Sequence, residues 1–121
     1  ASRFAQAVES VATQAESLGR TQVNWMHGYQ PWVGLDSQDS SAAYEAVKKG
    51  MEAFYRIPFE KFQRYTPSGT PSEVAEQLAP YIEAGASLFN LKVCAQNAEE
   101  EVALGADLVT ELRRCGAAVA G

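Results

Sequence analysis

Four stretches of the chain carry apolar residues at the spacing of a helix, and two others have the composition of a strand. The first helical stretch covers residues 3–18, must bury one side, and ends at Gly19, which suits a helix stop. A second helix is expected to end near Arg56, a third to begin after Thr70 and a fourth to begin after Asn97. The apolar positions of the four predicted helices are Phe4, Val8, Val11, Ala15 and Leu18; Ala43, Val47, Met51 and Phe54; Val74, Leu78, Tyr81 and Ile82; and Val102, Ala106, Val109 and Leu112.

Local capping signals mark the starts of the last two predicted helices. Thr70 is followed three residues later by Glu73, and Asn97 is followed in the same way by Glu100. The first of each pair can accept a hydrogen bond from a free backbone N–H of the first turn, and the second can complete a capping box. Pro80 lies inside the third helix and predicts a kink or an early break there.

Two segments are expected to form strands. Residues 22–35 are rich in aromatic and β-branched side chains, but a glycine and a proline interrupt them. They predict a strand that ends at Leu35, with a bulge or a separate short strand before Tyr29. Residues 88–93 form a second, compact strand. Between the second and third helices, residues 57–68 form an aromatic loop with room for a short helix.

Strands that alternate with helices predict an α/β fold with parallel β/α units, in which the helices cover the sheet. Side chains alternate between the two faces of a strand, so an apolar face is separated from a face that carries Lys92. The Lys92 face either lines the lumen of a closed barrel or meets solvent at an open sheet edge, because an unpaired buried ammonium is costly. The apolar face holds Val33, Leu35, Phe89, Leu91 and Val93, and the opposite face holds Gln30, Trp32, Gly34, Asn90, Lys92 and Cys94.

Composition and charge narrow the class of protein. The 121 residues suffice for one domain, and 46% hydrophobic residues with 21% charged residues are typical of a globular chain. A net charge of −5 argues against a nucleic-acid partner, since phosphate binding needs clustered cations. There is no apolar stretch of about 20 residues to span a membrane and no signal-peptide pattern, so a cytoplasmic protein is expected.

The residues that commonly carry catalysis are few. His27 is the only histidine, so no metal site is expected, since one histidine without partners cannot complete a ligand set. Cys94 lies where a predicted strand ends, and active sites of β/α barrels lie at the carboxyl ends of the strands. Cys115 lies near the chain end. Either thiol would need a nearby base and an electropositive setting to act as a nucleophile.

Several motifs, taken in order, resemble one enzyme family. They are PWVGLD, then MEAFYRIPFEKFQRYTPSGTPSEVAEQLAPYIEAGASLFNL, then a final acidic helix. This pattern covers residues from about 30 to 93 and resembles the C-terminal part of the luciferase-like flavin-dependent monooxygenases, a family that includes deazaflavin-dependent oxidoreductases. The helix that ends at Leu18-Gly19-Arg20 resembles the segment that precedes this region in the family.

The resemblance implies a TIM-type (β/α)₈ barrel, a fold that needs about 200 to 250 residues. A chain of 121 residues would supply the last two β/α units and the helix before them, so residues 1–121 are expected to be an incomplete barrel, either a C-terminal fragment or a truncated homologue. The nine glycines are scattered, and the family's Gly-rich phosphate segment has no counterpart among them. The chain alone is therefore not expected to bind the cofactor or to be active.

The resemblance also implies an oxidoreductase that uses reduced FMN or a deazaflavin on a small organic substrate that the sequence does not identify. Asn90 and Lys92 would orient a substrate or ring carbonyl, since the cofactor carries the chemistry. Trp32 either lines the same cavity or belongs to the core, and Arg64 either shapes the pocket mouth or is a surface charge. No residue is assigned as catalytic, and the pocket candidates are Asn90, Lys92, Cys94, Gln30, Trp32, Arg64 and Tyr65.

An alternative hypothesis belongs to another class. The chain could be a stand-alone, non-catalytic α/β module that binds a partner or pairs with itself. Unpaired strand edges invite pairing, so a homo-oligomer is expected under either hypothesis.

Overall fold

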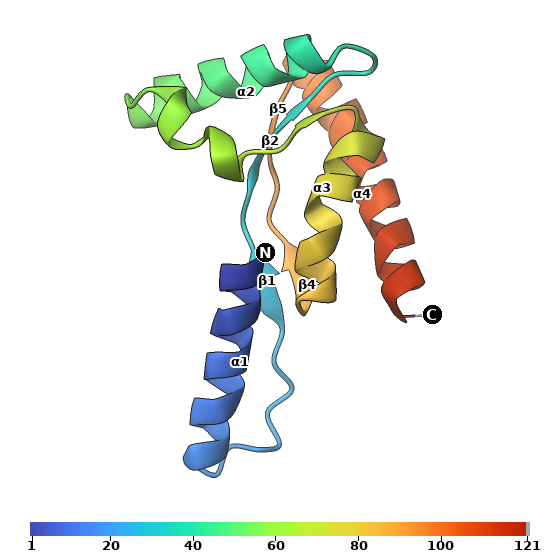
Figure 1. Cartoon of the computed structure of the whole chain (residues 1–121). Coiled ribbons are helices and arrows are strands. Elements are labelled where there is room, and N and C mark those ends of the chain that lie inside the picture. Colours follow the sequence, from blue (N-terminus) through green and yellow to red (C-terminus); the bar gives the residue numbers. More distant parts are fainter. Residues whose placement is uncertain (121) are drawn as a thin grey trace.

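The computed structural model describes residues 1–120 and shows a mixed α/β chain in which all paired strands are parallel (Figure 1). Within these residues the α-helices are Ser2–Ser17 (α1), Ser40–Tyr55 (α2), Pro71–Glu83 (α3) and Ala98–Ala120 (α4). The strands are His27–Tyr29 (β1), Trp32–Leu35 (β2), Ser68–Gly69 (β3), Ala86–Phe89 (β4) and Lys92–Cys94 (β5). Two 3-10 turns, Phe59–Lys61 (η1) and Gln63–Tyr65 (η2), occupy the aromatic loop. The predicted alternation of helices and strands is confirmed, but the predicted single strand over residues 88–93 is two strands, β4 and β5, and the unpredicted β3 begins at the end of the segment expected to be a loop.

The strands form two long ribbons that run side by side, residues 27–35 and residues 86–94 (Figure 1). β1 pairs with β4, and β2 pairs with β5. Between the two pairs the backbone N–H of Lys92 donates to the carbonyl of Pro31 at 3.0 Å, so the ribbons stay joined where the proline interrupts the ladder. The predicted separate short strand is β1, which ends at Tyr29. The short β3 pairs with the other edge of β2.

The main hydrophobic core lies between the ribbons and the pair α3 and α4. Val33, Leu78 and Leu108 are fully buried there, one from β2 and one from each helix. The predicted apolar face is confirmed, because Val33 and Leu35 are buried in this core and the second ribbon adds partly buried side chains to it. Those side chains are Phe89, Leu91 and Val93.

The opposite face of the ribbons is covered at its carboxyl end by α2. Gly34 makes this packing possible, because a Cβ there would collide with the backbone carbonyl of Ala43 and would lie 2.9 Å from Cγ1 of Val47. Val47, Met51 and Phe59 form a second, smaller core. Trp32 and Cys94 of the ribbons pack against this second core. At the carboxyl end of the ribbons this face is therefore covered by α2.

The predicted caps are present at both helix starts. The Thr70 hydroxyl oxygen accepts from the backbone N–H of Glu73 at 3.3 Å, and the Asn97 side-chain oxygen accepts from the backbone N–H of Glu100 at 2.9 Å. The Glu73 carboxylate accepts from the Thr70 hydroxyl at 3.0 Å and not from the Thr70 backbone N–H, so the second half of the predicted capping box is not formed there. Each cap satisfies an N–H that the helix itself leaves free.

Two helical predictions were wrong in detail. Of the kink or early break expected at Pro80, the early break is absent: α3 continues to Glu83, because a proline near the end of a helix removes only one of the last backbone hydrogen bonds. In α4, Val102 is 76% exposed and Val109 is 36% exposed. The buried stripe of α4 consists of Leu104, Leu108 and Leu112, so the predicted position at Leu112 is confirmed and the stripe runs through two other leucines.

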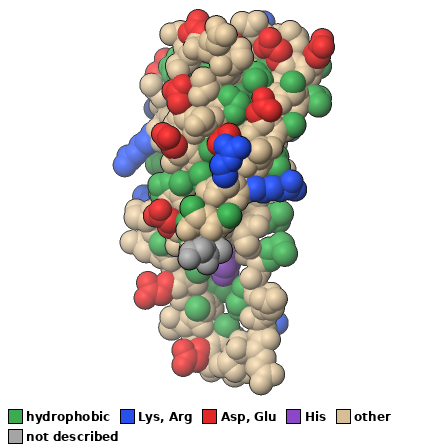
Figure 2. Space-filling model, turned by 90° about the vertical axis from the view of Figure 1, so that its right-hand side faces the viewer, with side chains coloured by type: hydrophobic (Ala, Val, Ile, Leu, Met, Phe, Trp, Pro, Cys, Tyr) green, Lys and Arg blue, Asp and Glu red, His purple; other side chains and the backbone are tan. Residues whose placement is uncertain are grey.

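Helix α1 lies beside β1 and extends below the ribbons, which gives the molecule an elongated outline (Figures 1 and 2). Phe4, at its N-terminal end, contacts the aromatic rings of Tyr29 and Tyr81. Farther along, Val11 is 38% exposed and Leu18 is 76% exposed. The helix itself is confirmed, but the expectation that it buries a full apolar side was wrong, because Ala15 is buried whereas Val11 and Leu18 of the same stripe are exposed.

Candidate functional site

Lys92 and Trp32 face each other across the two ribbons, as partners in the β2–β5 register. The Lys92 ammonium lies 5.4 Å from the centroid of the Trp32 ring and 5.6 Å from the centroid of the Phe54 ring. A cation over a ring face is attracted to it by about 0.5–1 kcal/mol at an exposed site. The two rings orient the ammonium of Lys92. Because the Lys92 side chain is exposed, its charge is still available to a ligand.

The rings around Lys92 form an aromatic cluster of Trp32, Phe54, Tyr55 and Phe62. The Trp32 indole N–H donates to the Tyr55 hydroxyl at 3.1 Å, and the Phe54 and Tyr55 ring centroids lie 4.9 Å apart. Tyr55 in turn lies 5.0 Å from Phe62. Phe54 is 64% exposed, so its predicted place on the buried stripe of α2 was wrong. The rings are tilted against one another, by 58° between Trp32 and Phe54 and by 78° between Phe54 and Tyr55, so the cluster offers an uneven apolar surface beside the positive charge of Lys92.

Cys94 lies on the same face, at the carboxyl end of β5, but it is held in packing. A Cβ at Gly50 of α2 would lie 2.7 Å from its sulfur, so helix and thiol are in close contact. Burial raises the pKa of the Cys94 thiol, and the nearby Glu101 raises it further against a lowering by Lys92. A thiol that stays protonated at neutral pH is a poor nucleophile, and the structure gives Cys94 a packing role.

A groove of about 580 Å³ opens beside Cys94, between α2 and the start of α4. Lys49, Glu45 and Glu101 line it. In open parallel sheets, ligands bind outside the carboxyl ends of the strands, which is where this groove lies. The remaining two candidates of this face, Gln30 and Asn90, are exposed near the middle of the ribbons. The structure thus brings together Lys92, Trp32 and Cys94 on one face.

Arg64 and Tyr65 do not join that group. They belong to η2 and line two cavities with Tyr29 and Tyr81, one of about 500 Å³ and one of about 230 Å³. Tyr29 shares the alternation of Val33 and Leu35, so these cavities lie on the α3 side of the ribbons. The predicted site residues therefore fall into two groups on opposite faces of the sheet.

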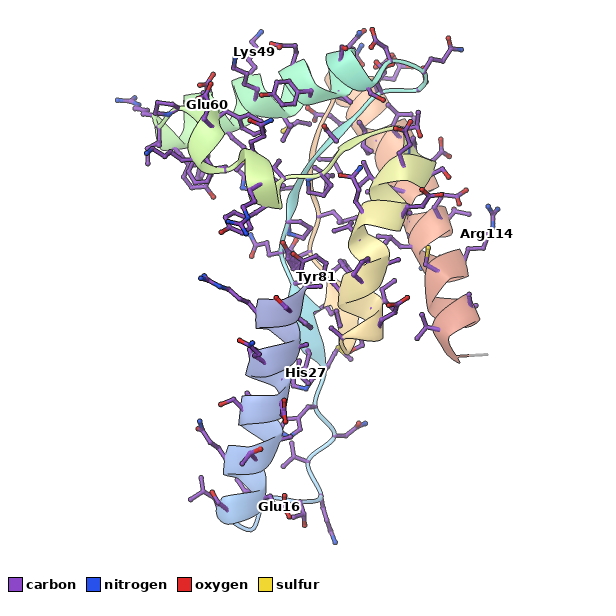
Figure 3. All side chains as sticks on the ribbon, viewed as in Figure 1. Glu16, His27, Lys49, Glu60, Tyr81 and Arg114 are labelled. Atoms are coloured by element: carbon purple, nitrogen blue, oxygen red, sulfur yellow. The ribbon has the colours of Figure 1, made fainter. Side chains whose placement is uncertain are left out.

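The Tyr29–Tyr81 pair is the feature that the sequence did not single out as a site. The two rings are stacked with centroids 4.0 Å apart, and the Tyr29 hydroxyl donates to the Tyr81 oxygen at 3.2 Å. Burial raises the pKa of Tyr29 far above its usual range, and the hydrogen bond to Tyr81 adds to the rise. Figure 3 shows Tyr81 between α3 and the N-terminal end of α1. The two tyrosines are 52 positions apart, so no local pattern pairs them.

Other polar residues have structural surroundings. His27 stacks on Trp25 with ring centroids 6.5 Å apart. The Asp36 carboxylate, just after β2, accepts from the backbone N–H groups of Gln38 and Asp39, and these bonds lower its pKa. Within residues 1–120 no three His, Cys, Asp or Glu side chains gather in a way that could hold a metal ion. Over the same residues, no helix is both long and apolar enough to cross a membrane.

No family model, curated protein or solved structure matches the chain.

Proposed function

We propose that the chain is the C-terminal portion of a luciferase-like oxidoreductase, a monooxygenase that uses reduced FMN or a deazaflavin on a small organic substrate. In this proposal the two ribbons, with α2, α3 and α4, are the last two β/α units of a (β/α)₈ barrel. Their parallel pairing and their crossover helices support it, as does the motif order between residues 30 and 93. The proposal includes a cytoplasmic location and no activity for the chain in isolation.

The observation that carries the proposal is the Lys92 ammonium held over the rings of Trp32 and Phe54, away from the helical core. In a closed barrel this face would be turned inward, and α2 would lie over the mouth, where loops that follow the strands build the active site. Lys92 would hold a ring or substrate carbonyl, or an anionic ring, and Asn90 would add an amide hydrogen bond.

The residues present fit the ring of such a cofactor. A flat ring can stack on a single ring of the aromatic cluster, and a ring oxygen matches the ammonium of Lys92. When bound, a reduced flavin or deazaflavin supplies the reducing equivalents for the reaction. The aromatic cluster would exclude water from the ring, and Lys92 would orient it without forming a covalent bond.

The proposal is tested first on the gene and then on the protein that it encodes. The reading frame upstream is expected to contain about 200 further codons for additional β/α units and a Gly-rich phosphate segment. The protein from the whole frame should bind reduced FMN or deazaflavin, followed by flavin absorbance. Lys92→Gln should lower turnover about tenfold or more, as loss of a hydrogen bond to a charged group does. Lys61→Gln, an exposed lysine on η1, is the matched control and should change nothing.

An upstream frame without strand–helix units would contradict the proposal. So would a whole protein that does not bind either cofactor, or one in which the two lysine variants lose the same activity.

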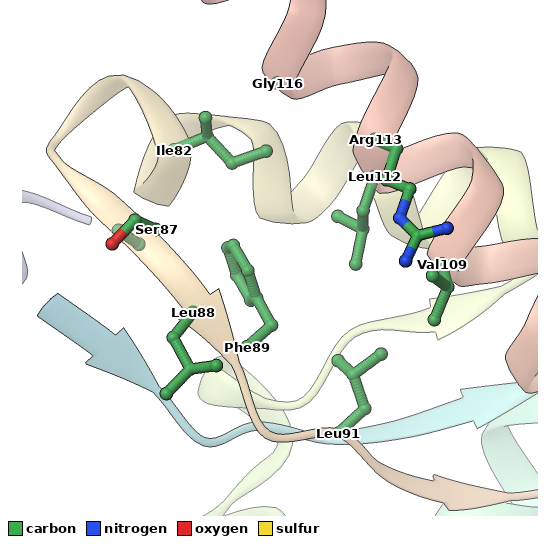
Figure 4. Close-up of a pocket in the computed structure, with 10 residues that line it drawn as sticks. Ile82, Ser87, Leu88, Phe89, Leu91, Val109, Leu112, Arg113 and Gly116 are labelled. Atoms are coloured by element: carbon green, nitrogen blue, oxygen red, sulfur yellow. The ribbon is translucent and has the colours of Figure 1, made fainter. Parts of the chain in front are cut away.

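A second function, self-association, is favoured by uncovered surface along β4. Within residues 1–120, β4 has only β1 as a hydrogen-bonded neighbour, so its other edge is unpaired. An apolar pocket of about 400 Å³ lies beside that edge, between β4 and α4. Figure 4 shows three apolar side chains pointing into this pocket, Ile82 from α3, Phe89 from β4 and Leu112 from α4. An unpaired edge next to an apolar groove is a surface suited to another strand.

The size of the chain in solution tests this second function. Light scattering across a range of concentrations is expected to show a dimer or larger species. Leu88, which lines the pocket and is 51% exposed, allows a mild disruption by Leu88→Glu, which should shift the chain toward monomer. Val102→Glu places the same charge on a residue of α4 that is 76% exposed and serves as the control. A wild-type chain that stays monomeric at all concentrations would rule self-association out.

A further inference from the structure

A cavity of about 500 Å³ lies where the first turn of α1, the turn η2 and the helix α3 meet beside β1. It is on the α3 side of the ribbons, opposite the Lys92 face. The smaller cavity of about 230 Å³ adjoins it and shares four of its lining residues. The charged and aromatic side chains that line the larger cavity are Arg3, Phe4, Tyr29, Arg64, Tyr65 and Tyr81.

The charge at this cavity is of one sign. Arg3 and Arg64 line it, and among the described residues that line either cavity there is no Asp or Glu. In the described part of the chain the ion pair is Arg114 with Glu111, so neither cavity arginine has a carboxylate within reach. Two unpaired arginines at one cavity are unexpected in a chain with a net charge of −5.

The hydroxyl groups at the cavity are also arranged as donors. Tyr29 donates to the Tyr81 oxygen at 3.2 Å, so the Tyr81 proton is free to point elsewhere. The stack of the two rings at 4.0 Å and the edge contacts of Phe4, at 6.0 and 5.8 Å, hold both hydroxyls in place. Tyr29 is protonated at neutral pH, since its pKa lies above the ordinary tyrosine value of 10.0, so no phenolate opposes an anion there.

We propose that this cavity binds the phosphate group of a small molecule, with Arg3 and Arg64 as the charged donors and Tyr81 as a neutral donor. Two guanidinium groups offer several N–H donors each, more than the two oxygens of a carboxylate can accept, whereas a phosphate has three or four oxygens. The rings of Phe4, Tyr29 and Tyr65 form an apolar wall that suits a flat ring attached to that phosphate.

The phosphate site does not depend on the proposed oxidoreductase function. It uses none of the residues of the Lys92 face, and its test uses probes that are not redox cofactors. Failure of one proposal therefore leaves the other untouched.

The test is a titration of the full chain with inorganic phosphate and with phenyl phosphate, followed by two-dimensional amide NMR and by calorimetry. Saturable binding is expected, with shifts centred on residues 3, 29, 64, 65 and 81, and phenyl phosphate should bind more tightly than phosphate. Arg64→Gln and Arg3→Gln should each weaken binding about tenfold or more. Arg56→Gln, at an exposed arginine that follows α2 and lines neither cavity, is the matched control and should bind as the wild type does.

Unfolding curves of the variants show whether each one is folded, and exposed Arg64 can be replaced without disturbing the core. The proposal is overturned if neither probe binds saturably, or if Arg56→Gln weakens binding as much as Arg64→Gln. It is also overturned if benzoate binds as tightly as phenyl phosphate, since the cavity would then be selective for a ring and not for phosphate.

Discussion

Replacing Gly34 by alanine is the most direct probe of how α2 sits on the ribbons. Gly34 is buried in β2, and α2 crosses directly over it. An added Cβ would collide with the carbonyl oxygen of Ala43, a backbone atom that cannot rotate away, and would lie 2.9 Å from Cγ1 of Val47. An ordinary contact is 3.4–4 Å, so α2 must shift as a body and its small core must loosen.

Overpacking of a tight core typically costs about 1–3 kcal/mol, and a clash with backbone falls at the upper end of that range. We therefore expect Gly34→Ala to lower the free energy of unfolding by about 3 kcal/mol. With an unfolding entropy of about 2.1 cal/mol/K per residue, a chain of this length would lose about 12 °C in Tm.

Urea and thermal unfolding, followed by circular dichroism, measure both quantities. Gly28→Ala is the matched control, because Gly28 lies on the first ribbon with the same alternation and its added Cβ would meet only Leu88, at 3.5 Å or more. That variant should unfold within about 1 kcal/mol of the wild type. If Gly34→Ala is as stable as Gly28→Ala, α2 does not lie on this face and the described packing is refuted.

Three further predictions concern the other helices and the tyrosine pair. Leu108→Ala should cost about 3 kcal/mol in urea unfolding because Leu108 is fully buried, whereas Val109→Ala should cost less than about 1 kcal/mol. Asn97→Ala should cost about 1 kcal/mol in the same assay through loss of the cap of α4, and an unchanged midpoint would contradict the cap. The raised pKa of Tyr29 stabilises the fold below the unfolded value of 10.0, and this contribution should be lost as pH rises above it. In a phenolate absorbance titration Tyr29 should ionise last, and Tyr81→Phe should lower its pKa; ionisation of all tyrosines together would contradict the pair.

The sequence predicted the order of elements and the face of each ribbon because both depend on local patterns. Alternation alone separated Phe89 and Val93 from Lys92, and the structure places the first two at the core. The orientation of α4 could not be predicted in this way. Its alanines, valines and leucines allow two apolar stripes, and only contact with α3 selects the one through Leu104 instead of the one through Val102.

The candidate site was predictable only in part, for a similar reason. Trp32 and Lys92 were placed on one face by alternation, but their register depends on how the ribbons align. The role of Phe54 was missed, because helical spacing shows which apolar residues share one face of α2 and does not show what that face contacts. Tyr29 and Tyr81 come together through the packing of α3 on β1, which no local signal encodes.

The proposed cofactor site depends on Lys92 being held over Trp32 and Phe54, on a face separate from the main core. The direct measurement is an NMR spectrum of the chain with assigned Lys92 side-chain signals. Ring currents should move the ε-protons of Lys92 upfield, nuclear Overhauser contacts should join them to both rings, and Trp32→Ala should reduce both effects. Lys92 signals at ordinary solvent-exposed positions, with no contact to either ring, would contradict the site.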